Sequence, residues 1–233
     1  MRYKNIIFKK KEGIASVTLN NPARNYLTAQ VLEELKCAFE SVLYDDEIEG
    51  IIITGKKHFS YGFDPRELSR MTYQKAKQFS QTGHEVFSVL SRIDRPVIAI
   101  ISGNAIGGGC ELALACDTRL ATTDAVFSPT LPNTGVTPCF GGSIILPKIV
   151  GKELAGTMIS SGKRIKAYDA FQMGLVDSLV DKNNAWLEAE QLLFSRTMRK
   201  YVHDLVDFAD ERERFARCFL DLALRKKIRS LAR

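Results

Sequence analysis

The sequence predicts an α/β fold with a helical C-terminal section. Two β-branched apolar runs, IIIT at 51–54 and VIAII at 97–101, alternate with stretches whose apolar residues recur at helical spacing. After residue 181 the pattern is helical throughout. The chain has 233 residues, of which 45% are hydrophobic, and this is enough to build one sizeable core.

The first hundred residues are predicted to form a hairpin, two long helices and two buried strands. Strands over 6–8 and 14–19 are joined by a turn at 10–13. Thr28 is predicted to cap a helix over 29–44, whose apolar stripe is Val31, Leu35, Phe39 and Val42. The order then continues with a buried strand at 51–54, a polar loop at 56–65, a helix at 73–92 and a buried strand at 97–101.

The second half is predicted as short elements around one long loop. A helix over 111–115 precedes strands at 118–121 and 125–127, and the Pro- and Gly-rich segment 128–142 forms a loop of a length typical of functional loops. Helices follow at 151–160 and 167–172, then a strand at 175–180. Beyond it, two helical stripes are formed by Trp186, Ala189 and Leu193 and by Phe215, Phe219 and Leu222. We therefore expect a core over 1–181 and a helical region over 182–233.

Composition excludes several classes of protein. The sequence contains no run of 18 apolar residues, which argues against a membrane span, and its first residues lack a signal-peptide pattern. The five cysteines are odd in number and show no Cys-x-x-Cys spacing, which favours reduced thiols in a cytoplasmic protein without a metal site.

The net charge of +6 is concentrated at the C-terminal end. Five basic residues and no acidic ones lie within 224–233, so the rest of the chain is nearly balanced. A solvated basic helix end explains this pattern, and attraction to an acidic partner or a phosphorylated ligand is the alternative. We expect no nucleic-acid binding, since no DNA-binding motif or aromatic-interleaved basic stripe accompanies the charge.

The most informative motif is GNAIGGGCELA at 103–113. Its three consecutive glycines, at 107–109, leave backbone N–H groups accessible beside the carboxylate of Glu111, an arrangement suited to stabilising an oxyanion while a proton moves. The run matches neither the P-loop nor the G-x-G-x-x-G pattern. Close packing of a helix against a strand is the alternative role for these glycines.

A series of motifs in order along the chain resembles the crotonase (enoyl-CoA hydratase/isomerase) superfamily. Besides the glycine run, they are LNNPARN at 19–25, FSYGFD at 59–64, RPVIA at 95–99, CDTRLA at 116–121, GVTP at 135–138 with GG at 141–142, LPKIVG at 146–151 and AFQMGLV at 170–176. The resemblance implies a spiral of ββα units with a helical C-terminal section. It also implies a homotrimer or dimer of trimers, acyl-thioester substrates on coenzyme A or acyl-carrier protein, and no cofactor other than the coenzyme A of the substrate.

The resemblance also implies which residues form the site. The backbone N–H groups of Phe63 and Gly108 would hold the thioester oxygen as an enolate forms, and Glu111 would be the acid/base. Arg24 matches a position suited to the phosphates of coenzyme A, although a solvated loop charge explains it equally well. Further substrate-binding positions are expected at Ser60, Tyr61, Gly62, Asp64, Gly107 and Leu131.

The sequence departs from the family pattern at three places. Leu131 stands where hydratases carry a second catalytic glutamate, Phe63 replaces a residue that is usually small, and the region after Val180 is compressed. Asp64 and Glu67 lie near the Phe63 amide, but Asp64 also suits a helix cap. His58, His84 and His203 are expected to be surface or locally hydrogen-bonded residues.

Three functions remain open at this point. The first is an atypical hydratase/isomerase acting through a stabilised enolate with one carboxylate. The second is a crotonase-type decarboxylase of acyl-CoA or acyl-carrier-protein substrates. The third is a protein that binds acyl-CoA without catalysis, which Leu131 and Phe63 favour and Glu111 argues against.

Overall fold

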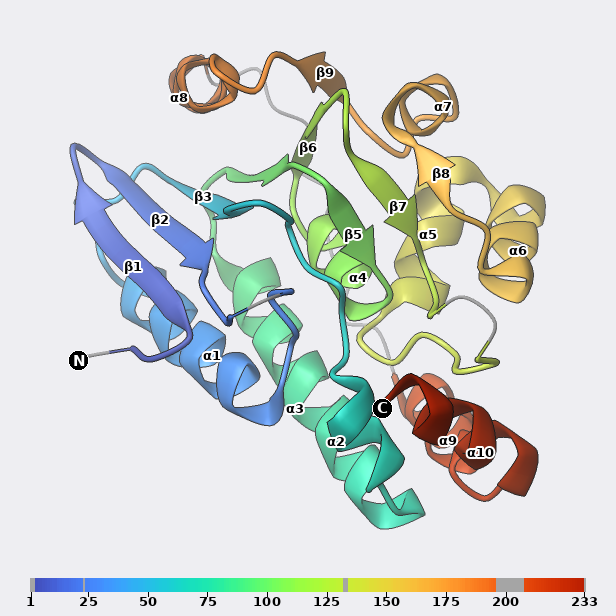
Figure 1. Ribbon diagram of the computed structural model, residues 1–233. Helices are drawn as coiled ribbons and strands as arrows, with labels where there is room; N and C mark the ends of the chain where they lie inside the picture. Colours follow the sequence, from blue (N-terminus) through green and yellow to red (C-terminus); the bar gives the residue numbers. More distant parts are fainter. Residues whose placement is uncertain (1–2, 23, 132–133, 196–207, 233) are drawn as a thin grey trace.

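The computed structural model describes residues 3–22, 24–131, 134–195 and 208–232. Its larger sheet has six strands in the order β1-β2-β3-β4-β6-β9 (Figure 1). β1 and β2 are antiparallel and the remaining neighbours are parallel. The strands are β1 (Ile6–Lys11), β2 (Ile14–Leu19), β3 (Gly50–Gly55), β4 (Val97–Ile101), β6 (Thr118–Thr122) and β9 (Ser178–Val180).

A second, three-stranded sheet has the order β5-β7-β8. β5 (Asn104–Ile106) and β7 (Val126–Ser128) are parallel, and β8 (Ile165–Lys166) runs antiparallel to β7. Ser60 extends this layer through an isolated parallel bridge to Ala105. Since a strand of the large sheet, a strand or bridge of the small layer and a helical segment recur in turn along the chain, the predicted spiral of ββα units is confirmed.

The helices are α1 to α10 in chain order. Their bounds are α1 (Ala29–Leu43), α2 (Pro65–Ser69), α3 (Tyr73–Arg92), α4 (Gly108–Leu114), α5 (Gly142–Val150), α6 (Lys152–Ser161), α7 (Ala167–Gln172), α8 (Ala185–Phe194), α9 (Ala209–Cys218) and α10 (Leu222–Leu231). None of the helices in the described ranges combines the length and the apolar composition that crossing a membrane would need.

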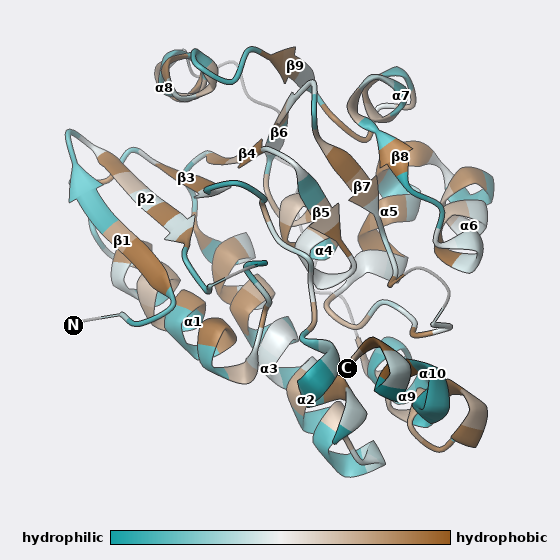
Figure 2. Cartoon of the chain, in the orientation of Figure 1, coloured by the Kyte–Doolittle hydropathy of each residue, from teal (hydrophilic) through white to brown (hydrophobic). Residues whose placement is uncertain are grey.

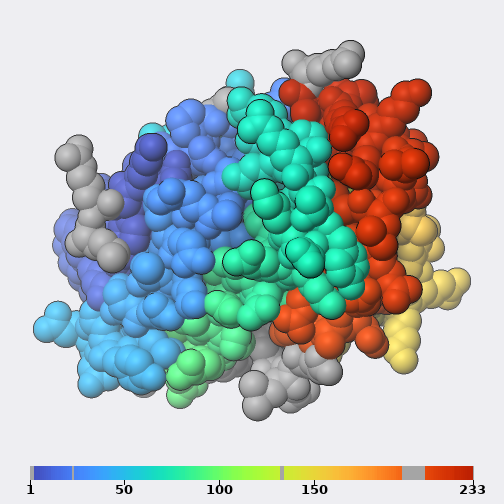
Figure 3. Space-filling view, turned by 90° about the horizontal axis from the view of Figure 1, so that it is seen from below, coloured from blue at the N-terminus to red at the C-terminus, as the bar shows by residue number. Residues whose placement is uncertain are grey.

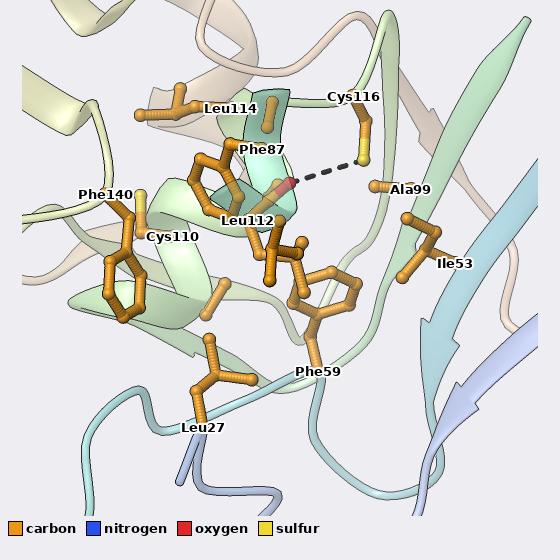
Figure 4. Packing of buried hydrophobic residues seen from close by; sticks show 14 of the residues in the cluster. Leu27, Ile53, Phe59, Phe87, Ala99, Cys110, Leu112, Leu114, Cys116 and Phe140 are labelled. Carbon is orange, nitrogen blue, oxygen red and sulfur yellow. Dashed lines mark hydrogen bonds between the residues drawn. The ribbon is translucent and has the colours of Figure 1, made fainter. Parts of the chain in front are cut away.

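The large sheet is buried on both faces, and the alternation of side chains along β3 shows how. Ile51 and Ile53 belong to the main core with α1 and α3, whereas Ile52 packs in a smaller cluster with Ala189 and Leu193 of α8. The strands at the centre of the fold are correspondingly hydrophobic (Figure 2). Helix α4 itself lies among buried side chains, including Phe59, Phe87 and Phe140 (Figure 4).

The C-terminal helices pack back onto the core. Helix α9 contacts α3, and α10 contacts α2, so that the red C-terminal helices lie alongside the teal α2–α3 segment on the face shown in Figure 3. This placement brings Glu211 of α9 into contact with α3 and with the start of α5.

Several sequence predictions need correction. Trp186 and Leu222 do not belong to the buried stripes, since their exposed fractions are 40% and 78%; Ala185 instead joins Ala189 and Leu193 in the core. Helix α4 begins at Gly108 rather than residue 111, and β9 begins at Ser178 rather than residue 175. The sequence analysis did not predict β5, α5 or β8, and it anticipated α2 only through the possible cap at Asp64.

Candidate active site

Two loop segments run side by side and bring the Phe63 and Gly108 amides together. Ser60 N–H donates to Asn104 O at 2.9 Å, and Ile106 N–H donates to Ser60 O at 2.9 Å. Phe63 and Gly108 each lie three residues beyond the parallel bridge between Ser60 and Ala105, so they occupy equivalent positions on adjacent segments. Within the described ranges neither N–H donates a hydrogen bond to another residue. Two unpaired donors side by side form a cradle suited to an oxyanion.

Gly62 allows this close approach. Its φ of +74° is strained for L side chains, and a Cβ there would lie 2.3 Å from Ile106 O and 2.9 Å from Gly108 N. The Ser60 hydroxyl fixes the same loop, because it is fully buried, accepts from Gly62 N–H at 2.9 Å and donates to Asn25 O at 2.6 Å. Ser60 and Gly62 therefore set the spacing between the two amides.

We expect Gly62→Ala to destabilise the fold by about 2 kcal/mol or more and to abolish activity, because the added Cβ must push the Phe63 and Gly108 segments apart. Thermal unfolding and activity measured together test this. Gly156→Ala in α6 is the matched control, since no atom lies within 4 Å of its Cβ position, and it should leave both unchanged or raise stability. A Gly62→Ala protein as stable and active as wild type would contradict the assigned geometry.

Glu111 extends from α4 into a fully buried position. Helix α4 starts at Gly107, whose φ of 51° suits only glycine readily, and Glu111 lies one turn further along. Its Oε1 accepts from the N–H groups of Cys139, Phe140 and Gly142 at 3.1, 2.8 and 2.9 Å. Its Oε2 has no hydrogen-bond partner among the described residues. One oxygen therefore fixes the carboxyl, and the other is left without a hydrogen-bond partner among these residues.

The protonation of Glu111 follows from this environment. Burial, with the negative charge of Glu211 in addition, raises the pKa of Glu111 to about 8, against the lowering effect of the three N–H donors. A carboxyl whose pKa lies near the operating pH can both accept and return a proton, which is the property of an acid/base catalyst.

The Phe63 side chain closes one side of the site. Its ring lies against Gly108, where a Cβ would meet it at 2.5 Å, and it packs edge-on to Phe79 and Phe140 with ring centroids 5.6 and 5.1 Å apart. The ring centroid of Phe215 in α9 lies 6.0 Å from that of Phe63, with the ring planes at 56°. Aromatic side chains thus fill space next to Glu111 that a smaller residue at position 63 would leave open.

Leu131 lies next to Gly107, the first glycine of the triple-glycine run. Its Cδ1 is 3.6 Å from the Cβ position of Gly107, and it lines a cavity of about 350 Å³ together with Gly135, Val136 and Lys227. The side chain next to the amide cradle is therefore apolar, at the place where the sequence resemblance leads one to expect a second acid.

The remaining predicted residues are Asp64, Arg24 and Tyr61, which lie on or next to the loop that carries the Phe63 amide. Asp64 caps α2 by accepting from Arg66 N–H at 2.9 Å, and it also lines a cavity of about 720 Å³ with Glu67 and Phe79. The Arg24 guanidinium is exposed and lies 5.1 Å from the Tyr61 ring centroid. Tyr61 in turn accepts from Asn104 Nδ2 at 3.0 Å. Asp64 thus has the capping role offered as one alternative above.

Sequence reasoning missed Glu211, and it expected His84 to be a surface or locally hydrogen-bonded residue, whereas its partner lies 127 residues away. Glu211 of α9 and His84 of α3 are both buried, and His84 Nε2 lies 3.4 Å from Glu211 Oε1. A charged residue four positions before Phe215 on an apolar helix face was the available signal. His203 lies outside the described residues. No group of three or more His, Cys, Asp or Glu side chains suited to a metal occurs in the described parts of the chain.

Comparisons with known proteins identify the family of the chain. The enoyl-CoA hydratase/isomerase family model matches residues 9–214. The chain is 37% identical over 195 residues to a crotonyl-CoA hydratase of Syntrophomonas wolfei, covering 82% of this chain and 75% of that protein. It is 35% identical to a short-chain-enoyl-CoA hydratase of Clostridium acetobutylicum with the same coverage.

Solved structures of this fold superpose closely. DspI of Pseudomonas aeruginosa has a TM-score of 0.76 at 30% identity, covering 97% of this chain and 93% of that one. An enoyl-CoA hydratase subunit of Geobacillus kaustophilus has the same TM-score at 28% identity, covering 83% and 75%. With this sequence match, this fold and this cradle of amides beside a buried glutamate, the chain belongs to the enoyl-CoA hydratase/isomerase family.

Proposed function

We propose that this protein isomerises 3-enoyl thioesters to 2-enoyl thioesters through an enolate held by Phe63 and Gly108. The relatives act on enoyl-CoA according to their names, which supports an acyl thioester of coenzyme A as the substrate. Glu111 removes a proton from C2, the negative charge passes to the thioester oxygen between the two N–H groups, and Glu111 returns the proton at C4. Each preorganised N–H contributes about 3 kcal/mol to holding that charge.

The observation that favours isomerisation over hydration is the pairing of Glu111 with Leu131. Isomerisation moves one proton between two carbons and needs one carboxyl, whose Oε2 is unpartnered here. Hydration needs a second group to orient and deprotonate a water, and the side chain beside Gly107 is apolar. Loss of one acid/base group costs about 10² to 10⁴ in rate, so hydration is expected to be the slower reaction.

The exposed side chains suggest how the rest of the substrate and the assembly are organised. Arg24, positioned over Tyr61, is proposed to contact the phosphates of coenzyme A or of a carrier protein's prosthetic arm. Large apolar side chains stay exposed on α7 and α8, including Tyr168, Trp186 and Phe194. Such a surface favours association of copies, and we propose a homotrimer.

The test compares three reactions of the purified protein. We expect conversion of 3-hexenoyl-CoA to the 2-enoyl thioester and deuterium exchange at C2 of butyryl-CoA in heavy water, with hydration of crotonyl-CoA slower by about 10² or more. Faster hydration than isomerisation would contradict the proposal. Tight binding of acyl-CoA with no exchange at C2 would instead indicate a binding protein, and release of CO₂ from a malonyl-type thioester without isomerisation a decarboxylase.

A further inference from the structure

Two buried carboxylates accept hydrogen bonds from different backbone N–H groups at the start of α5. Glu111 accepts from residues 139, 140 and 142, while Glu211 accepts from Gly141 N–H at 2.5 Å and Ser143 N–H at 3.0 Å. The N–H groups of Gly141 and Gly142 are adjacent along the chain but bind different carboxylates. Both side chains are at most 1% exposed. The two carboxyl groups are thus buried neighbours.

Glu211 is built to carry the negative charge of this pair. It accepts from the Ser143 hydroxyl as well, and His84 Nε2 lies 3.4 Å from its Oε1. Burial raises the pKa of Glu211, but the hydrogen bonds from His84, Ser143 and Gly141 together outweigh burial and hold the pKa below its ordinary value. The His84 ring is fixed by stacking on Phe208, with centroids 4.2 Å apart and planes 11° from parallel.

The other titratable groups around the pair supply no compensating charge to Glu111. Cys110 of α4 and Cys139 of the loop face it, and burial raises the pKa of both thiols, so they stay neutral. From α9, the exposed Arg214 guanidinium donates to Ser143 Oγ at 3.2 Å, on the Glu211 side. From α3, His84 also lies on the Glu211 side. Besides burial, the charge that raises the pKa of Glu111 is that of Glu211.

We propose that Glu211, held by His84 and Ser143, is a positioning residue that supplies a fixed negative charge beside Glu111 and so makes Glu111 the strong base that removal of a C–H proton requires. This inference rests on the proposed function. A like charge nearby favours the protonated form of a carboxyl, and a stronger base abstracts a proton from a weak carbon acid more readily. In this protein a carboxylate from the C-terminal helices thus assists Glu111, although it does not replace the water-activating acid missing at position 131.

The experiment follows the protonation of Glu111 directly. The infrared carbonyl band of a protonated carboxyl is titrated with pH and assigned to Glu111 by its absence in Glu111→Gln. We expect a midpoint near 8 in wild type. We expect it to lie lower by at least about one pH unit in Glu211→Gln. Glu213→Gln is the matched control, because Glu213 lies on the same helix but binds Tyr73, Lys77 and Arg217, and it should leave the midpoint unchanged.

The same shift should appear in the pH profile of kcat/KM for isomerisation, while KM stays near the wild-type value. Ser143→Ala removes only the hydroxyl donor of Glu211 and provides a milder variant if Glu211→Gln does not fold; its midpoint should fall by a smaller amount. An unchanged midpoint in every folded variant overturns the inference. A midpoint that shifts as expected in a protein with no isomerase or exchange activity would sustain the inference and refute the proposed function.

Discussion

Replacing Glu111 by glutamine should lower the isomerase kcat by about 10³ and leave acyl-CoA binding nearly unchanged. Glutamine has the same shape, and its carbonyl oxygen can accept the N–H groups of Cys139, Phe140 and Gly142 that now bind Oε1. It cannot carry a proton between C2 and C4. Steady-state rates with 3-hexenoyl-CoA, together with exchange at C2 of butyryl-CoA, measure the effect.

The stability of this variant provides its control. Folding raises the Glu111 pKa from 4.5 to about 8, so the native state binds more protons than the unfolded state between these values. Wild-type stability contributed by this group should therefore be present at low pH and be lost as the pH rises toward 8. Glu111→Gln lacks this dependence, and its free energy of unfolding should exceed that of wild type at pH 8. A folded Glu111→Gln protein with wild-type turnover would exclude Glu111 as the acid/base.

Introducing a glutamate at position 131 should raise the hydration of crotonyl-CoA by about 10². Leu131 lies beside Gly107 and is half-buried in a cavity that also contains Thr130, Thr137 and Ser160, so a carboxylate there keeps polar neighbours and room for a water. The new group would stand beside Gly107, next to the residue that provides one amide of the cradle. The measurement is the loss of the enoyl thioester absorbance on addition of water.

Leu131→Gln serves as the matched control, since it places a polar group of the same size without a titratable proton and should give no gain. The double variant with Glu111→Gln should lose the added activity, because hydration uses both carboxyl groups. If Leu131→Glu folds and binds acyl-CoA but hydrates no faster, position 131 does not face the β-carbon of the substrate.

The parts of the site that depend on local sequence could be predicted, and those that depend on distant contacts could not. Phe63, Gly108 and Glu111 belong to motifs that follow buried strands, and the parallel bridge between Ser60 and Ala105 places the amides of Phe63 and Gly108 in equivalent positions. Their catalytic roles stay predictions until measured. Glu211 lies 70 residues from Gly141 and 127 from His84, and helical spacing cannot reveal which distant donor a buried carboxylate meets.

Helix patterns failed for two identifiable reasons. Apolar spacing shows that a helix has a buried face, but it does not fix which of two adjacent residues lies on that face. In α8 the small residue Ala185 is buried, whereas the neighbouring Trp186 is exposed. Helix α5 was missed because it starts at the second of two glycines and contains Pro147, both of which ordinarily disfavour a helix. Its first N–H groups are bound by Glu111 and Glu211, and those contacts compensate for the weak propensity.

Because Glu211 belongs to α9, the site is assembled from two parts that lie far apart along the chain. The amide cradle and Glu111 come from segments within the first 111 residues, joined by contacts between neighbouring turns of the spiral. The charge that strengthens Glu111 arrives only when α9 docks on α3 and α5, a contact of long sequence separation that is costly to close. A local opening of α9 would therefore weaken the base while leaving the cradle folded, so proton transfer depends on a helix that lies far along the chain from the segments that form the cradle.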